Sequence, residues 1–323
     1  MNGADTAWIM VATALVLFMT LPGLALFYGG LVRARNVLSV FMHCYAIACL
    51  MSILWFAFGY SIAFGGSGNA YWGGLDKAFL NGITVDTLAG TLPEILFFAF
   101  QMTFAIITPA LIVGAYVERI GFGFVLLFSS LWMLLCYAPV VHWVWGGGFL
   151  SDGGIFGDMG VRDFAGGIVV HETAGLAALI LAIFLGARRD PSKPPHNPGM
   201  VMIGAAMLWV GWFGFNGGSQ LYMDTSGNVA DISRIFSNTN TAAAAGAVAA
   251  LILTQLLYKK PDLTMILNGA LAGLVSITAE PLTPSLVSAT LIGAVGGVIV
   301  VFAVPLLDRL KIDDVVGAIP VHL

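Results

Sequence analysis

Long apolar segments follow one another along the whole chain, and the polar positions gather in the short stretches between them. A helix that crosses about 30 Å of hydrocarbon needs about 20 apolar residues. The pattern predicts membrane helices near residues 7–31, 37–64, 94–117, 121–142, 163–186, 199–219, 234–257, 263–279 and 284–307. A tenth segment begins at Val315, but the nine residues to Leu323 rise only about 13 Å in a helix, so we expect a tenth helix that is cut short.

Composition agrees with a protein embedded in a membrane. Of the 323 residues, 59% are hydrophobic and 9% are charged, whereas soluble domains are about half apolar and about a quarter charged. Between the apolar segments there is no polar block large enough to fold separately. We therefore predict an all-α polytopic membrane protein with one domain over residues 1–323. The first segment lacks a basic leader, so it is interpreted as a retained helix rather than a signal peptide.

The few charges predict an orientation and exclude one class of partner. The net charge is −4 and the bases are scattered, so no basic patch indicates binding to nucleic acid. Connections after the odd-numbered helices hold ten bases, which are Arg33, Arg35, Arg119, Arg188, Arg189, Lys193, Lys259, Lys260, Arg309 and Lys311. The other connections hold three, which are Lys77, Arg162 and Arg234. Because short cytoplasmic loops are rich in Lys and Arg, the N-terminus is predicted to lie outside.

An internal repeat is the most informative feature of the sequence. The segments DFAGGIVVH (163–171) and DVVGAIPVH (314–322) agree at five positions, and each places a histidine eight residues after an aspartate. Five predicted helices separate the copies, so the second enters the membrane in the opposite direction. This indicates an inverted repeat of five plus five helices, a design in which substrate sites lie near the midplane between the halves. A weaker echo relates GLALFYGG (23–30) to VGWFGFNGG (210–218).

Ionisable side chains at membrane depth are costly and usually face a cavity or a partner. His171 and His322 are the strongest candidates, because the repeat pairs them; the alternative is that each bonds a neighbouring helix. In a dry channel both are expected to be neutral, each with one donor and one acceptor nitrogen. Asp163 and Asp314 begin their helices, where a carboxylate can cap free N–H groups; for Asp163 a role in a cation-attracting vestibule is an equal alternative. Glu172 points away from His171 and is interpreted as a buried hydrogen bond or a subunit contact.

Aromatic side chains supply a second set of candidates. Phe100 and Phe104 are four residues apart and share one helix face, which core packing would explain equally well. Trp145 lies in HWVWGGGFL, where an interfacial aromatic belt is the alternative interpretation. An aromatic face can hold a cation, and the Ser219 hydroxyl could accept a hydrogen bond from the same cation.

Several of these stretches occur together in the order typical of one known family. They are LPGLALFYGGLVRARNVLS (21–39), FQMTFAIITPALIVGAYVERIGF (100–122), VVHWVWGGG (140–148), DFAGGIVVHETAG (163–175), GWFGFNGGS (211–219) and KIDDVVGAIPVH (311–322). With these motifs the chain resembles the ammonium transporter, methylammonium permease and Rh superfamily over essentially its whole length. The resemblance implies the ammonium transporter fold, with ammonium, ammonia and methylammonium as substrates and with no cofactor.

The resemblance also assigns the outer part of a pore. Trp145, Phe104 and Ser219 match the outer ammonium recruitment site of the family. Phe100 with Phe104 resembles its gate of stacked phenyl rings. Asp163 matches the aspartate that the family needs near this site.

Deeper in the pore, the resemblance makes His171 and His322 the twin histidines and places Phe27 and Tyr28 at the inner end. The family forms homotrimers in the plasma or inner membrane, with one pore in each subunit. It completes the tenth helix, adds a long eleventh and ends in a cytoplasmic tail that helps to bind PII-type regulators. The tenth helix is incomplete in this sequence, and the eleventh and the tail lie outside it.

Two functional hypotheses follow from the sequence, with a third far behind them. In the first, ammonium binds at the outer aromatic site, loses its proton and passes the twin histidines as ammonia. In the second, the chain is an ammonium sensor that uses the same pocket, with a signalling module after residue 323. The third, an intramembrane enzyme built on His171, Glu172 and Asp163, lacks a metal-ligand spacing or a nucleophile motif, so we predict that the chain is not an enzyme.

Overall fold

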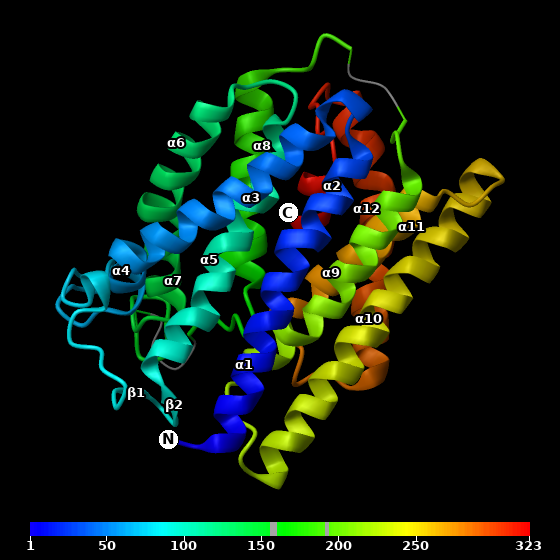
Figure 1. Ribbon diagram of the computed structural model, residues 1–323. Coiled ribbons are helices and arrows are strands. Elements are labelled where there is room, and N and C mark those ends of the chain that lie inside the picture. The colour runs from blue at the N-terminus through cyan, green and yellow to red at the C-terminus, as the bar shows by residue number, and fades with distance from the viewer. Residues whose placement is uncertain (156–159, 191–193) are drawn as a thin grey trace.

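Long helices dominate the structure. The computed structural model describes residues 1–155, 160–190 and 194–323, so Lys193 lies outside the described residues. Within these ranges eight helices are long and apolar enough to cross a membrane, and α11 (Leu263–Thr278) is a shorter apolar helix. Figure 1 shows the helices side by side, with the N-terminus, β1 and β2 at one end, which we call the outer end. The prediction of an all-α polytopic membrane protein is confirmed.

The first half of the chain contains five spans, most of which join α-helices to other helical turns. They are α1 (Gly3–Phe18), η1 (Met19–Leu24) and α2 (Ala25–Leu31); η2 (Ala34–Asn36), α3 (Val37–Leu54), η3 (Trp55–Gly59) and α4 (Tyr60–Phe64); α5 (Glu94–Tyr116); α6 (Phe122–Trp132), η5 (Met133–Tyr137) and α7 (Ala138–Val144); and η7 (Gly167–Glu172) with α8 (Thr173–Leu185). The segments η1, η3, η5 and η7 are π-helical. Pro22 lies inside η1 and has no N–H to donate, which favours a departure from α geometry there.

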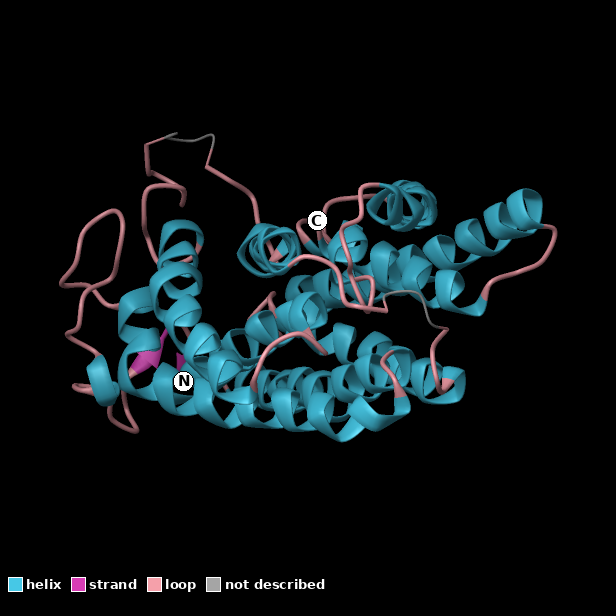
Figure 2. Cartoon of the chain, turned by 90° about the horizontal axis from the view of Figure 1, so that it is seen from above, coloured by secondary structure: helices cyan, strands magenta, loops and turns pink. Residues whose placement is uncertain are grey.

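Between the second and third spans the chain makes a small excursion at the outer end. It contains η4 (Ala78–Leu80) and a two-stranded antiparallel hairpin of β1 (Leu88–Ala89) and β2 (Leu92–Pro93). The second half of the chain continues with α9 (Pro198–Gly218), α10 (Ser226–Tyr258), α11, α12 (Leu286–Arg309) and the short α13 (Ala318–His322). In Figure 1 the C-terminal end lies in the middle of the bundle, and in Figure 2 it lies along one side between neighbouring helices. Leu323 lies directly against Gly175 of α8.

Three helices begin at residues other than those predicted, because caps set the first turn and the apolar pattern does not show caps. The Asn2 side chain accepts the N–H groups of Ala4 and Asp5, so the first helix begins at Gly3 rather than near residue 7. The Thr225 hydroxyl accepts the Asn228 N–H, and α10 therefore begins eight residues before its predicted start at 234. The fifth span begins at Gly167 rather than at 163, because its N-cap residue Gly166 has a left-handed conformation.

Small residues bring α10, α11 and α12 into close contact. A Cβ atom on Gly246 would overlap the carbonyl oxygen of Gly269, and a Cβ atom on Gly297 would overlap the carbonyl oxygen of Gly246. Membrane helices have no hydrophobic driving force toward one another in lipid, so such close backbone approach supplies much of their association. The three helices thus form one tightly packed unit of the second half.

Replacing Gly246 by alanine should weaken this unit. The added methyl group must displace the Gly269 backbone, and overpacking of this kind costs about 1–3 kcal/mol. We expect a lower unfolding temperature of the detergent-solubilised protein, measured by differential scanning fluorimetry. Gly123→Ala is the matched control, since among the described residues no atom outside its own turn of helix lies within 4 Å of the position of its new methyl group. Equal unfolding temperatures for the two variants would contradict the close contact.

Candidate functional site

His171 and His322 lie side by side at the centre of the bundle. Their Nδ1 atoms are 3.0 Å apart, and the rings are nearly parallel, with centroids 5.0 Å apart and an angle of 5° between the planes. A hydrogen bond between two Nδ1 atoms requires that only one of them carries a proton. In the neutral pair, the donating ring therefore has a free Nε2 acceptor, and the accepting ring has an Nε2–H donor. The prediction that the repeat brings these rings together is confirmed.

The segment before His171 is organised by the carboxylate of Asp163. Its two oxygens accept the backbone N–H groups of residues 166–169 at distances of 2.6–2.9 Å. Gly166 has φ +108°, a left-handed conformation that favours glycine. This turn keeps residues 163–166 out of the helix and explains why the fifth span begins at Gly167. The capping interpretation of Asp163 is confirmed.

The second copy of the repeat has the same construction. Asp314 accepts the N–H groups of Val316 and Ile319 at 3.4 and 2.7 Å. Gly317 has φ +73° and stands three residues after Asp314, as Gly166 stands three residues after Asp163. Each copy thus uses an aspartate and a left-handed glycine to begin the short helical segment that carries its histidine.

A cavity of about 440 Å³ lies at the outer end of the third span. Its wall is largely aromatic and includes the predicted recruitment residues Phe104, Trp145 and Ser219 together with Phe100. The Trp145 indole is held in place because its Nε1 donates to the Asp163 carbonyl oxygen at 2.6 Å. The structure therefore brings together from α5, α7 and the end of α9 the residues that the sequence assigned to one outer site.

The Ser219 hydroxyl donates its proton to the Phe215 carbonyl oxygen at 2.8 Å. Its lone pairs therefore remain available to accept a hydrogen bond from a solute in the outer cavity. The Phe104 ring meets the Trp145 ring edge to face, with centroids 6.0 Å apart and planes at 90°. A small cation in this cavity would meet aromatic surfaces and a hydroxyl acceptor.

Below the outer cavity, aromatic rings form a continuous column that ends at the histidines. Phe100 and Phe104 meet at 5.1 Å with their planes at 75°, so the prediction of stacked rings is wrong in this detail. Aromatic pairs favour edge-to-face contacts because ring edges are positive and faces are negative. Phe215 continues the column, since its ring lies 4.4 Å from Phe104 and 5.7 Å from His171.

Sequence reasoning missed Phe215 and Trp212, although both lie in the motif GWFGFNGGS. The Trp212 ring stacks on His171 at 5.4 Å with an angle of 12°, and its Nε1 donates to the Thr278 hydroxyl at 2.9 Å. A signal for Phe215 was present in the weak echo of the motifs, because aligning their Gly-Gly pairs sets Phe215 opposite Phe27. For Trp212 the sequence offers no comparable signal.

On the inner side, the histidine pair lines a second cavity together with Phe27 and Tyr28, the two residues that the resemblance places at the inner end of a pore. Its volume of about 20 Å³ is room for about one water-sized molecule. The Tyr28 hydroxyl donates to the Leu111 carbonyl oxygen at 2.9 Å, so its proton is occupied. Most of the remaining lining is apolar, so this small cavity offers few polar groups besides the two histidines.

Two ionisable candidates, Asp163 and Glu172, differ in burial and in contacts. The Asp163 carboxylate is turned to the backbone that it caps, so Asp163 reaches the outer cavity through its carbonyl bond to Trp145 and through Phe164, which lines that cavity. Glu172 is exposed, and within the part of the chain that the structure describes it forms no hydrogen bond or ion pair. Its interpretation as a buried hydrogen-bonded residue is wrong for this chain, and a subunit contact stays a prediction.

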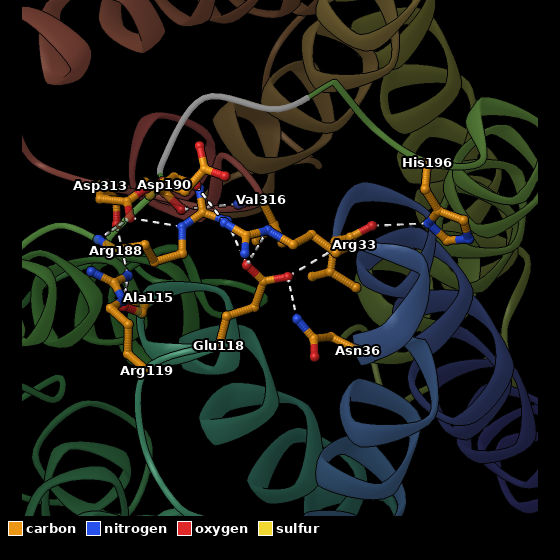
Figure 3. A network of polar contacts seen from close by, with 12 residues as sticks. Arg33, Asn36, Ala115, Glu118, Arg119, Arg188, Asp190, His196, Asp313 and Val316 are labelled. Carbon is orange, nitrogen blue, oxygen red and sulfur yellow. Dashed lines mark hydrogen bonds and ion pairs between the residues drawn. The ribbon is translucent and has the colours of Figure 1, made fainter.

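At the inner end, a charged network connects four segments that are far apart in the sequence (Figure 3). Glu118 accepts hydrogen bonds from the Arg33 N–H, the Asn36 amide at 2.6 Å and the Arg188 guanidinium at 2.9 Å. Arg188 also binds both carboxylate oxygens of Asp313, at 2.8 and 2.9 Å. In the sequence these bases indicate only an orientation, because loop spacing does not show which charges meet.

Partial burial and mutual hydrogen bonds shift the pKa values of the side chains in this network. Burial alone would raise the pKa of Glu118, but hydrogen bonds from Asn36, the Arg33 backbone and Arg188 outweigh it and leave this pKa below its usual range. For Asp313, burial is likewise outweighed by the bonds from Arg188, and its pKa is lowered. The two carboxylates in turn raise the pKa of Arg188 despite its desolvation. All three side chains are therefore charged at neutral pH.

Comparison with known proteins adds independent findings. The model of the Ammonium Transporter Family matches residues 7–323. The ammonium transporter of Bacillus subtilis is 48% identical over 281 residues, which cover 86% of this chain and 66% of that protein. The ammonium transporter of Mycobacterium bovis is 42% identical over 346 aligned positions, with coverage of 100% and 71%. The chain thus spans about two thirds of the length of these relatives, which are named as transporters and not as enzymes.

Solved structures give the same fold. A structure described as a Sensor Amt Protein has a TM-score of 0.90 and 32% identity, and the match covers 99% of this chain and 79% of that one. The crystal structure of Candida albicans Mep2 has a TM-score of 0.89 and 34% identity, with coverage of 99% and 70%. The predicted helical fold and the resemblance inferred from the motifs are confirmed.

Replacing Glu118 by glutamine should destabilise the protein in a pH-dependent way. At pH 7 the variant loses charge-assisted bonds to Arg188 and Arg33, and we expect the free energy of unfolding to fall by about 2 kcal/mol. Because the folded-state pKa of Glu118 is lowered, its contribution is fully present above the unfolded-state value of about 4.3 and is lost as the pH falls through the lower folded-state value. The difference between wild type and variant should therefore shrink at low pH.

Denaturant unfolding in detergent at pH 7 and at about pH 3.5 measures both effects. Asp308→Asn is the matched control, because Asp308 is exposed and its carboxylate has no hydrogen bond to any residue that the structure describes. A Glu118→Gln penalty of equal size at both pH values would show that the lost bonds do not depend on the charge of Glu118.

Proposed function

The chain belongs to the Ammonium Transporter Family, and from that premise we propose that it carries ammonium, as the cation or as ammonia, across a membrane. The observation that carries the proposal is the contact between His171 and His322. This pair lines the inner cavity and meets, through Phe215, the aromatic wall of the outer cavity. A small solute that moved between the two cavities would have to pass these rings.

The outer cavity supplies the first step of the proposed path. Ammonium exchanges water for the faces of Trp145 and Phe104 and for a lone pair of Ser219. Cation–π attraction contributes about 0.5–2 kcal/mol, depending on how far the cation is desolvated. Potassium has no N–H groups to donate, so a site that offers hydrogen-bond acceptors discriminates by donor count as well as by radius.

The inner cavity sets the second step. An ion in a narrow and mostly apolar space pays a large desolvation cost unless it is paired, and no carboxylate lines this cavity among the described residues. Ammonium therefore passes its proton to solvent water at the outer cavity before it reaches the inner cavity, and ammonia continues. At the histidine pair, ammonia can donate to the free Nε2 of one ring and accept from the Nε2–H of the other, so the neutral pair complements it.

The proposal includes an orientation and an assembly. The N-terminus lies outside and the connections rich in bases lie in the cytoplasm, because short cytoplasmic loops are enriched in Lys and Arg. Three of these bases, Arg33, Arg119 and Arg188, lie close together in one polar network (Figure 3). The protein sits in the plasma or inner membrane, where methylammonium is a second substrate. A homotrimer with a PII-type regulator is the assembly that the resemblance implies.

A second candidate function is ammonium sensing through the same outer cavity. The observation that favours it is the high structural similarity to the Sensor Amt Protein. A sensor needs ammonium to bind, but it does not need ammonia to pass the histidines. Flux through purified protein therefore distinguishes the two functions, whereas binding does not.

Replacing His171 by alanine should abolish most of the flux. The variant removes the Nδ1 partner of His322 and one of the two Nε2 groups that meet the solute. Leaving a buried polar group without its hydrogen bond costs about 1–3 kcal/mol, which corresponds to about 10- to 100-fold in rate. We expect initial rates of ammonium uptake into proteoliposomes, and ammonium-evoked currents, to fall by about that factor while the protein remains folded.

His196→Ala is the matched control, because His196 lies in an inner loop and, among the described residues, bonds only the Val32 carbonyl. Its uptake should stay near the wild-type rate. If His171→Ala takes up ammonium at the wild-type rate and with unchanged selectivity, the histidine pair does not line the transport path. A wild-type protein that binds ammonium but moves none would favour the sensor.

A further inference from the structure

Gln101 stands on α5 between Phe100 and Phe104 and lines the outer cavity. The residue is 8% exposed, and its buried Oε1 has no hydrogen-bond partner among the residues that the structure describes. Its Nε2 likewise bonds no residue in the described part of the chain. The amide is therefore a buried polar group whose orientation no neighbour fixes.

An unpaired buried acceptor is uncommon. Most buried side-chain oxygens in proteins have at least one partner, and one without a partner calls for a specific explanation such as a bound ion, water or ligand. Position 101 is also surrounded by residues that could have packed with an apolar side chain, since Phe97, Phe100 and Phe104 line the same cavity. The amide is thus a polar group in a mostly aromatic wall.

The other polar groups near the cavity are already partly used. The Trp145 N–H is held by Asp163 and the Ser219 proton is held by Phe215, so neither needs a solute to be satisfied. Ser219 offers lone pairs from the end of α9, while Gln101 offers a carbonyl oxygen from α5. An ammonium ion has four N–H groups directed to the corners of a tetrahedron. Ser151 and Asp152 also line the cavity, but the Ser151 proton is held by the Gly148 carbonyl and Asp152 is exposed. Among the described residues, Gln101 therefore offers this donor set a buried side-chain oxygen that has no other partner.

We propose that Gln101 is a specificity-determining residue of the outer cavity and accepts an N–H bond from the bound ammonium ion through its side-chain carbonyl. A half-turn about the last side-chain bond exchanges Oε1 and Nε2, and no existing hydrogen bond has to break. The inference rests on the proposed function only to the extent that ammonium binds in the outer cavity. It applies equally to a transporter and to a sensor.

The Gln101→Leu variant tests this role. It retains a side chain of similar size and removes the acceptor. We expect the half-saturating ammonium concentration to rise on the order of 10- to 100-fold, which corresponds to about 1.4–2.8 kcal/mol. The maximal uptake rate at saturating ammonium should change much less, because Gln101 lies on the outer side of the aromatic column and the histidine pair is intact.

The measurement is calorimetric titration of the full detergent-solubilised chain with ammonium chloride, with sodium chloride as the blank, alongside uptake into proteoliposomes. Gln255→Leu is the matched control, because Gln255 is exposed on α10 and far along the chain from the cavity residues of α5. Gln101→Glu retains acceptor oxygens and loses the amide donor, so its half-saturating concentration should stay within about threefold of wild type or fall.

The outcomes separate this inference from the proposed function. Wild-type affinity in Gln101→Leu would overturn the inference even if the protein transports. If Gln101→Leu does not fold, a Gln101→Glu variant that binds about tenfold more weakly would overturn it instead. Ammonium binding that depends on Gln101 in a protein without flux would support the inference and contradict transport. A wild-type chain that binds no ammonium would overturn both.

Discussion

The Nδ1–Nδ1 hydrogen bond between His171 and His322 depends on two segments that enter the bundle independently and stop at the same depth. A helix turns by about 100° for each residue, so a start displaced by one residue would point either ring away from the other. Asp163 and Asp314 prevent such a displacement, because each carboxylate fixes N–H groups of the turn that follows it and each turn passes through a left-handed glycine. The geometry of the pair is therefore set by residues five to eight positions before each histidine.

The inner ionic network fixes the same two segments from their other ends. Arg188 follows the helix that contains His171, Asp313 precedes the turn that contains His322, and the two side chains form a bidentate pair. Glu118 follows the inner end of α5 and binds Arg188. Because α5 carries Phe100 and Phe104 near its outer end, this contact connects the aromatic column to the same ionic network. The contacts are strong because the carboxylates are nearly buried, with side-chain exposures of 4% for Glu118 and 7% for Asp313.

Much of the fold could be predicted from the sequence, because a lipid environment imposes a simple rule on the length and apolarity of spans. The pairing of His171 with His322 was also predictable, since the two copies of the repeat keep the same spacing between aspartate and histidine. Helix starts at Gly3 and Ser226 were not, because a single side-chain oxygen at Asn2 or Thr225 decides them. Phe215 escaped notice because apolar motifs rich in glycine recur by chance. The partners of Glu118 depend on how distant loops meet, which no local pattern reports.

Because a single proton lies between the two Nδ1 atoms, the histidine pair can take up a further proton from one side only. If a proton arrived at the free Nε2 of the donating ring, the shared proton could shift to the other ring, which would then release its own Nε2 proton on the far side. After this transfer the roles of the two rings are exchanged, and the pair can accept its next proton only from the side on which it has just released one. Repeated transfer in one direction therefore requires both rings to return to their first tautomers. Neutral ammonia that only exchanges hydrogen bonds with the pair leaves the tautomers as they were and needs no such reset.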